Sequence, residues 1–197
     1  MQEDGKRWIM SVTLLVNLNR PIPLSEIEEV VSSALGELLN LDRNPDIKAS
    51  IDESDRGGTP SENVLTATSN RVLCFVPGHD EIATVTPMTV PVQTATADGS
   101  YAFSEQACLS VAWHFKKSPL CWALVGAVAL GIARSQGSEI EDNSGFFTIA
   151  NVQSPEEFCQ MLRVPTGQTD LESAAEALYS KMPKSAEVTA WLERQSR

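Results

Sequence analysis

The chain has 197 residues and a formal net charge of −11 at pH 7, with 42% hydrophobic and 21% charged residues. This composition is that of a globular protein and excludes the disordered and membrane-embedded classes. The negative charge disfavours binding to nucleic acid or to anionic lipid. A chain of this length buries enough apolar surface to fold as a single domain without a metal ion or a disulfide.

The first half of the domain, about residues 7–93, is predicted to contain a strand, a helix and further strands. A capping box at Ser25–Glu28 opens the helix, and apolar residues recur at helical spacing up to Leu38. Residues 42–62 are polar and contain two glycines and two prolines, which predicts a long exposed loop. Strands are expected at residues 8–18, 63–68, 71–77 and 82–92.

The second half, about residues 101–195, follows a connection at residues 94–100 and repeats the order strand, helix, strand. Strands are expected at residues 107–116 and 145–151. Capping boxes at Ser154–Glu157 and Thr169–Glu172 each open an amphipathic helix, the first of which ends near Leu162. The order of elements predicts one domain of the α+β class, with helices packed on one face of a mainly antiparallel sheet.

The most apolar segment of the chain is the uncharged run at residues 120–133. Ser118 and Pro119 are typical of a helix start, and Gly137 is typical of a helix end. The run is shorter than the roughly 20 residues that cross a bilayer. We therefore expect a buried core helix and no membrane anchor.

The acidic residues are concentrated early in the chain. Residues 26–62 hold ten acidic and three basic residues, a net charge of −7. Such a cluster favours a basic protein partner, although it is also compatible with a role in solubility alone. The predicted partner-binding residues are Glu26, Glu28, Glu29, Glu37, Asp42, Asp46, Asp52, Glu53 and Asp55.

Candidate catalytic residues are few. His114 lies in a predicted strand and His79 in a predicted turn, and neither has a nucleophile and an orienting acid in a local motif, so structural roles are favoured. No spacing typical of a metal site or a phosphate-binding loop is present, so we expect neither a metal nor a cofactor. The scattered residues Cys74, Cys108, Cys121 and Cys159 indicate free buried thiols in a reducing cytoplasm, with a disulfide as the alternative.

The segments ACLSVAWHFK, LCWALVGAVALGIA and GFFTIANVQSPEEF, within residues 107–160, carry a resemblance of pattern. Their order resembles the later part of an uncharacterised bacterial α+β family, in which a strand containing a histidine precedes a long helix. In size, acidity and order of elements the chain is similar to immunity proteins of bacterial contact-dependent and type VI toxin systems. The resemblance transfers no functional residue, but it implies a protein that binds a cognate toxin.

Three functional hypotheses follow from the sequence. The first is a cytoplasmic protein-binding module, an immunity protein that neutralises a basic toxin through its acidic surface. The second is a small enzyme with a dispersed site around His114. The third is an acidic secretion chaperone or adaptor, which we expect to dimerise through an exposed apolar helix.

Overall fold

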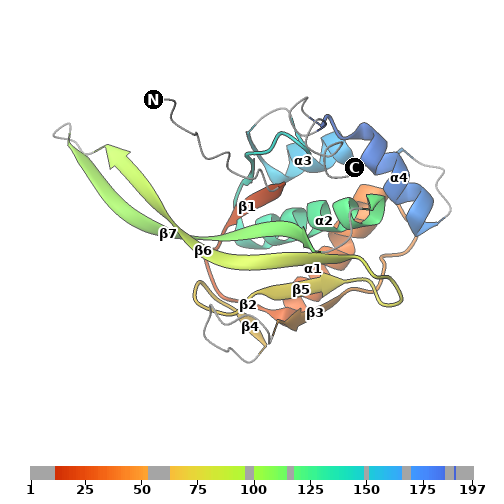
Figure 1. Ribbon diagram of the computed structural model, residues 1–197, viewed down its shortest axis with the longest axis horizontal. Helices are drawn as coiled ribbons and strands as arrows, with labels where there is room; N and C mark the ends of the chain where they lie inside the picture. The colour runs from red at the N-terminus through yellow and green to blue at the C-terminus, as the bar shows by residue number, and fades with distance from the viewer. Residues whose placement is uncertain are drawn as a thin grey trace, which may run out of the picture.

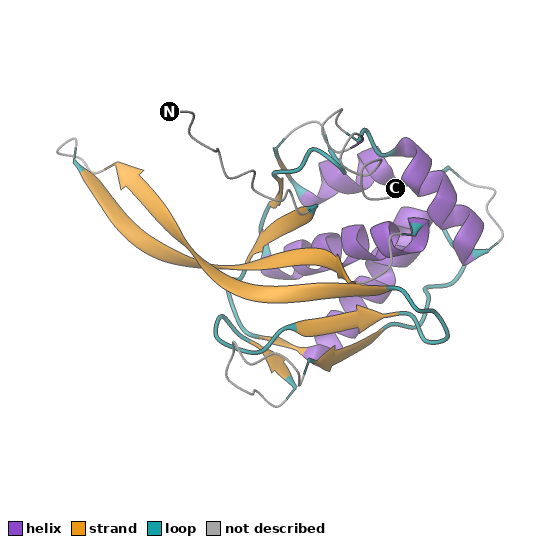
Figure 2. Cartoon of the chain, in the orientation of Figure 1, coloured by secondary structure: helices purple, strands orange, loops and turns teal. Residues whose placement is uncertain are grey.

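The computed structural model describes residues 12–52, 63–95, 100–114, 118–148, 151–165, 170–184 and 189. They form four helices, one seven-stranded sheet in the order β3-β5-β6-β7-β1-β8-β9 and one two-stranded sheet, β2-β4, and every strand pair in these ranges is antiparallel. The fold is therefore of the predicted α+β class (Figures 1 and 2). The strands are β1 (Thr13–Asn17), β2 (Ile22–Pro23), β3 (Lys48–Ile51), β4 (Val64–Leu65), β5 (Val72–Phe75), β6 (Ile82–Ala95), β7 (Tyr101–His114), β8 (Ile140–Asp142) and β9 (Val152–Gln153).

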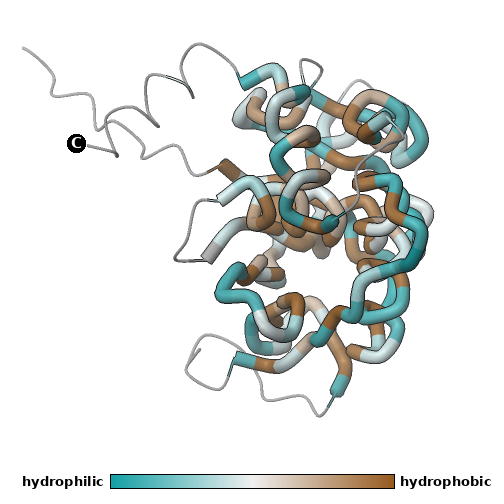
Figure 3. The backbone as a smooth tube through the Cα atoms, turned by 90° about the vertical axis from the view of Figure 1, so that its right-hand side faces the viewer, coloured by the Kyte–Doolittle hydropathy of each residue, from teal (hydrophilic) through white to brown (hydrophobic). Residues whose placement is uncertain are grey.

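The helices are α1 (Leu24–Leu39), α2 (Pro119–Gln136), α3 (Pro155–Leu162) and α4 (Leu171–Lys181). The first two pack against the sheet, and α3 and α4 contact both of them. Hydrophobic segments concentrate between these layers, with hydrophilic segments at the periphery (Figure 3). The core thus lies on one face of the sheet, around α2.

Helix α2 is the buried centre of this core. By length and composition Pro119–Gln136 is apolar enough to cross a bilayer, but 83% of it is buried inside the protein, as expected for a core helix. It begins at the predicted cap, where Ser118 Oγ accepts a hydrogen bond from the Cys121 N–H, and it ends at Gly137 in the left-handed conformation. The local signals at both ends of this helix are therefore confirmed.

The two predicted halves are joined within one sheet. Strand β1, from the first half, pairs with β7 on one side and β8 on the other, and both of those strands come from the second half. The predicted connection at residues 94–100 overlaps the ends of two long strands, because β6 and β7 pair over their full length from Ile82–His114 to Ala95–Tyr101, and residues 96–99 lie outside the described part of the chain. Strand β6 ends later in the chain, and β7 begins earlier, than the sequence predicted.

The predicted capping box at Ser25–Glu28 is wrong. Helix α1 starts at Leu24, directly after Pro23, and has no side-chain cap. Glu26, in the first turn, binds Arg20 and Ser135 instead. By contrast, the box at Ser154–Glu157 is formed as predicted, and α4 is capped by Asp170, whose carboxylate accepts from the Ser173 N–H, with Thr169 outside the described residues.

The predicted loop at residues 42–62 contains a strand. Ile47 is 2% exposed and leads into β3, which pairs with β5 along the edge of the sheet. Residues 53–62 lie outside the described part of the chain. The strand predicted at 63–68 is reduced to Val64–Leu65, because the chain turns at Thr66–Ser69, where the Ser69 N–H donates to the Thr66 carbonyl.

The predicted strand at residues 145–151 is also wrong. The backbone N–H groups of Ser144 and Gly145 donate to Asp142 Oδ1 at 3.0 Å each, and those of Phe147 and Thr148 donate to Oδ2 at 2.8 and 2.9 Å. Asp142 is 1% exposed. Amides that bind one carboxylate in this way are not available for a sheet, so strands form before and after this turn, as β8 and β9.

We predict that Asp142→Asn lowers the free energy of unfolding by about 2–4 kcal/mol, because one amide oxygen replaces two carboxylate oxygens and an NH₂ group faces buried N–H donors. Urea unfolding followed by circular dichroism measures the difference. Glu141→Gln, on the neighbouring residue of β8, is the matched control and is expected to change stability little. Equal effects of the two variants would contradict the account.

A second prediction concerns the contact between α1 and α2. A Cβ atom added at Gly131 would lie 2.6 Å from the Val30 carbonyl oxygen of α1, whereas one added at Gly126 meets its nearest atom, on the Phe147 ring, at 3.5 Å. Gly131→Ala is expected to lower stability by about 1–3 kcal/mol through overpacking. Gly126→Ala is expected to be neutral or to raise stability by up to about 1 kcal/mol, since alanine favours helices. Thermal unfolding of both variants tests this difference in sign.

Candidate protein interface

Two of the predicted partner-binding residues form ion pairs inside the protein. Glu26 of α1 binds the guanidinium of Arg20, and Glu37 of α1 binds that of Arg134 in the last turn of α2. In each pair the hydrogen bond from arginine lowers the pKa of the carboxyl below its usual value. Both arginines lie outside residues 26–62, so a charge count over that segment does not include them.

Two further residues of the predicted set are also held by internal contacts. Asp52 is 9% exposed, and its Oδ2 lies 2.9 Å from Nε and 2.6 Å from Nη2 of Arg71. Glu28 accepts a hydrogen bond at 3.0 Å from the N–H of Ala49 and so ties α1 to β3. These carboxylates support the fold.

The other described members of the set lie at the surface. Glu29 and Asp42 are exposed, and Asp46 is exposed within 3.3 Å of Lys48 Nζ. Glu53 and Asp55 lie outside the described residues. The exposed acidic surface is therefore smaller than the sequence indicated, and its role in binding a partner stays a prediction.

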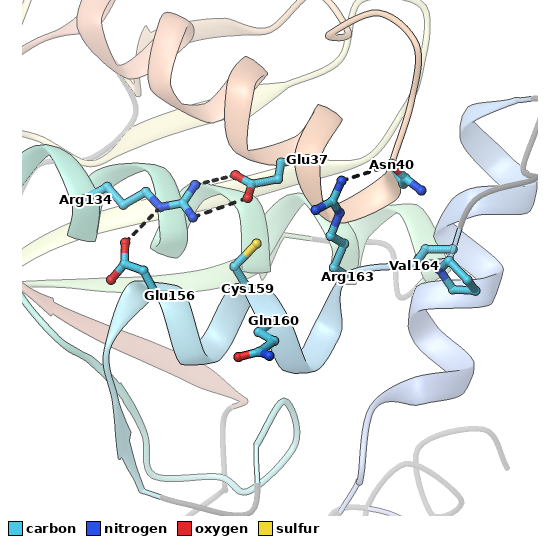
Figure 4. A pocket seen from close by; sticks show the side chains of 9 residues that line it. Glu37, Asn40, Arg134, Glu156, Cys159, Gln160, Arg163 and Val164 are labelled. Atoms are coloured by element: carbon cyan, nitrogen blue, oxygen red, sulfur yellow. Dashed lines mark hydrogen bonds and ion pairs between the residues drawn. The ribbon is translucent and has the colours of Figure 1, made fainter.

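A groove of about 610 Å³ lies where α1, α2 and α3 meet. Figure 4 shows Arg134 between Glu37 and Glu156, and Arg163 beside Asn40. The guanidinium of Arg134 binds Glu37 and lies 3.6 Å from Glu156, and Arg163 Nη2 donates to Asn40 Oδ1 at 3.3 Å. Because both arginines bind side chains on or next to α1, these contacts, which we call the clamp, hold the ends of α1, α2 and α3 together.

The thiols do not provide a nucleophile. All four cysteines are free and buried, as their scattered spacing indicated. Burial, followed by the hydrogen bond with Glu37, raises the pKa of Cys159 in the groove to about 11, and burial raises the pKa of Cys74 to about 12. Such thiols are protonated at neutral pH and unreactive.

The two histidines lie at the end of the sheet opposite the tip of the hairpin. His79 is in the turn between β5 and β6, and His114 ends β7 opposite Ile82; the side chain of His114 is outside what the structure describes. A pocket of about 140 Å³ at this end includes Glu81 and Ser118, whose hydroxyl donates to the Glu81 carboxylate at 2.9 Å, but not His79. Within the described residues, no three His, Cys, Asp or Glu side chains converge to hold a metal ion.

Among the described residues, the most exposed large apolar side chains lie on the hairpin of β6 and β7, which extends away from the body of the protein (Figure 1). We define the arm as Thr86–Ala95 of β6 and Tyr101–Gln106 of β7, the parts that lie beyond the pairing of β5 with β6 and of β1 with β7. Tyr101 is 63% exposed and Phe103 is 73% exposed. The only charged residue of the arm is Glu105.

The sequence interpretation missed these aromatic residues because it ended the connection at residue 100 and began the next strand at residue 107. A signal was present: residues 101–106 (YAFSEQ) carry two aromatic residues of high strand propensity, Tyr101 and Phe103, at alternate positions. This spacing alone does not show that the face carrying the aromatic side chains is exposed to solvent, because the same pattern is equally typical of a strand with one buried face.

We predict that Glu37→Gln weakens the clamp and lowers the free energy of unfolding at neutral pH by about 1 kcal/mol or less, as for other partly exposed ion pairs. Because the folded pKa of Glu37 is lowered, the stabilisation is present above the usual carboxyl value of 4.5 and is lost as the pH falls through the folded value. Urea unfolding between neutral and acid pH should therefore show the two stability curves converging in acid. Glu156→Gln, at a carboxylate that is 74% exposed, is the control, and its free energy of unfolding should follow that of the wild type at every pH.

Comparisons of the chain with protein-family models, with curated proteins and with solved structures found no match.

Proposed function

We propose that this chain is a protein-binding module and that the arm is its binding element. The observation that carries the proposal is the exposure of Tyr101 and Phe103 on a hairpin that projects from the body. Aromatic side chains are enriched at the centres of protein interfaces, where charged residues are depleted. The arm has this composition, because Glu105 is its only charged residue.

The remaining polar clusters support the same proposal. The carboxylates of Glu26, Glu37 and Asp52 bind arginines within the protein, and the buried Cys159 is protonated. These groups stabilise the contacts between helices and strands. The arm, where large apolar side chains are exposed, is therefore the surface that we propose for the partner.

A finer proposal is that the partner is a basic toxin and that the chain is its cytoplasmic immunity protein. The net charge of −11 attracts a basic protein over a distance of about a Debye length and increases its rate of association. Exposed acids such as Glu29, Asp42 and Asp46 contribute to this field. The resemblance in size, acidity and order of elements that the sequence suggested agrees with this proposal.

We predict that the double variant Tyr101→Ser, Phe103→Ser weakens partner binding by about a thousandfold, since aromatic anchors at interfaces contribute roughly 2 kcal/mol each and every 1.4 kcal/mol is about tenfold in affinity. The partner is first isolated from the native cell on the wild-type chain, then purified and titrated calorimetrically with each variant. Val152→Ser, which removes an exposed apolar residue outside the arm (48% exposed), is the matched control and should bind as the wild type does.

Two experiments test the role of the arm and the toxin hypothesis separately. If the double variant is folded and binds the purified partner with unchanged affinity, the arm is not the binding element. The toxin hypothesis is tested by producing the partner in a host cell with and without the chain. Growth arrest that the wild type relieves, and the double variant does not, supports an immunity protein. Normal growth with the partner alone leaves a protein-binding module and overturns immunity.

A further inference from the structure

We propose that the outer edge of β7 in the arm binds an extended segment of a basic partner protein, which adds to the sheet as an antiparallel strand. The inference rests on the proposed function and specifies how the arm binds. β7 pairs with β1 only at Cys108–Ala112, and among the described residues no strand pairs with Tyr101–Gln106 on that side. Exposed strand edges of this kind bind extended peptides through backbone hydrogen bonds.

The direction of the free backbone groups follows from one hydrogen bond. The Leu18 N–H donates to the Ala107 carbonyl at 3.0 Å, so the backbone groups of Ala107 point away from β6. Because these groups alternate along a strand, those of Tyr101, Phe103 and Glu105 point to the same outer side. Each of the three residues offers one N–H donor and one carbonyl acceptor to an added strand.

The outer edge of β6 is less suited to strand addition. Pro87 and Pro91 pair in register with Leu109 and Glu105. These partners are odd-numbered residues of β7, like Ala107, so both proline nitrogens face the outer side of β6. Proline has no N–H to donate, and its presence is a common way to block an exposed edge. The two edges of the arm therefore differ, and the edge of β7 is the open one.

The register also defines the side chains that the added strand needs. A strand antiparallel to β7 continues in the direction of β1, so it passes Glu105 first, then Phe103, then Tyr101. Residues directly opposite each other on an antiparallel pair share a face and interact. The best segment thus has a basic residue opposite Glu105, followed two and four residues later by β-branched or aromatic residues opposite Phe103 and Tyr101.

The start of this segment lies next to a pocket at the base of the arm. The pocket has a volume of about 180 Å³ and is lined by Leu18, Asn19, Pro21 and Ala107, among others. The Leu18 N–H occupies the Ala107 carbonyl, so an added strand begins beyond Ala107, at the rim of this pocket. A second copy of this chain is the less favourable occupant, because it carries the same net charge of −11.

The test selects ligands from a library of randomised nine-residue peptides, displayed on phage, with the full chain as target. The expected consensus is a basic residue followed by apolar residues two and four positions later. A synthetic peptide with the selected consensus sequence is then titrated with variants of the chain. Glu105→Pro removes an outward N–H at the position opposite the natural Pro91 and is expected to weaken binding of this peptide about tenfold or more. Gln93→Pro is the matched control, because it changes an outward position on the blocked edge of β6 and should leave peptide binding unchanged. Glu105→Gln should bind the peptide but lose the preference for a basic residue opposite position 105.

The same question is asked without altering the protein. Methylation of the peptide nitrogen at the residue opposite Phe103 removes a donor to β7, whereas methylation at the next residue alters a group that points away from it. The first peptide should lose binding and the second should retain it. If both bind equally, or if no selected peptide depends on the β7 edge, strand addition is overturned.

The outcomes also separate this inference from the proposed function. If Tyr101→Ser, Phe103→Ser abolishes partner binding while Glu105→Pro does not, the arm binds through side chains alone; the proposed function then stands and strand addition fails. If neither variant affects the partner, both fail. A dimer of the wild-type chain in sedimentation that Glu105→Pro returns to a monomer would assign the edge to a second copy and overturn the proposal.

Discussion

The close packing of α2 against α1 is the contact on which the rest of the structure depends. Gly131 allows the backbone of α2 to approach the Val30 carbonyl of α1, and the sheet, α3 and α4 then pack around this pair. Near the two ends of α2, Arg134 binds Glu37 of α1 and Ser118 donates a hydrogen bond to Glu81. A helix that is buried on nearly all sides has little surface for binding a partner, which is why the proposed binding element lies at the periphery.

Signals that act within a few residues could be read from the sequence. The caps at Ser118 and Ser154 and the end of α2 at Gly137 are in their predicted places, because each is formed by groups close together in the chain. The fold class was predictable for the same reason, since it follows from the order of such elements. Predictions failed where a side chain that fits a local sequence motif instead binds a residue far away in the chain. Glu28 was assigned to a capping box, but it accepts a hydrogen bond from the N–H of Ala49, which is 21 residues away.

The candidate interface was harder to predict than the fold. The acidic cluster was clear from composition, but its exposure was not, because Arg20, Arg71 and Arg134 come from other segments and bind three of its carboxylates. The arm depends on how far β6 and β7 extend past their neighbours, which is a property of the register of the whole sheet. Tyr101 and Phe103 have no local feature that distinguishes them from the buried aromatics Phe146 and Phe147.

The prolines of β6 have a consequence for the size of any assembly that the arm forms. Continuous stacking of one hairpin on the next would require the β7 side of each molecule to meet the β6 side of another, and this heterologous contact repeats without closure. Pro87 and Pro91 interrupt the donors on the β6 side. The prolines thereby oppose growth into fibres, and under the proposed strand addition a complex ends after a single added chain.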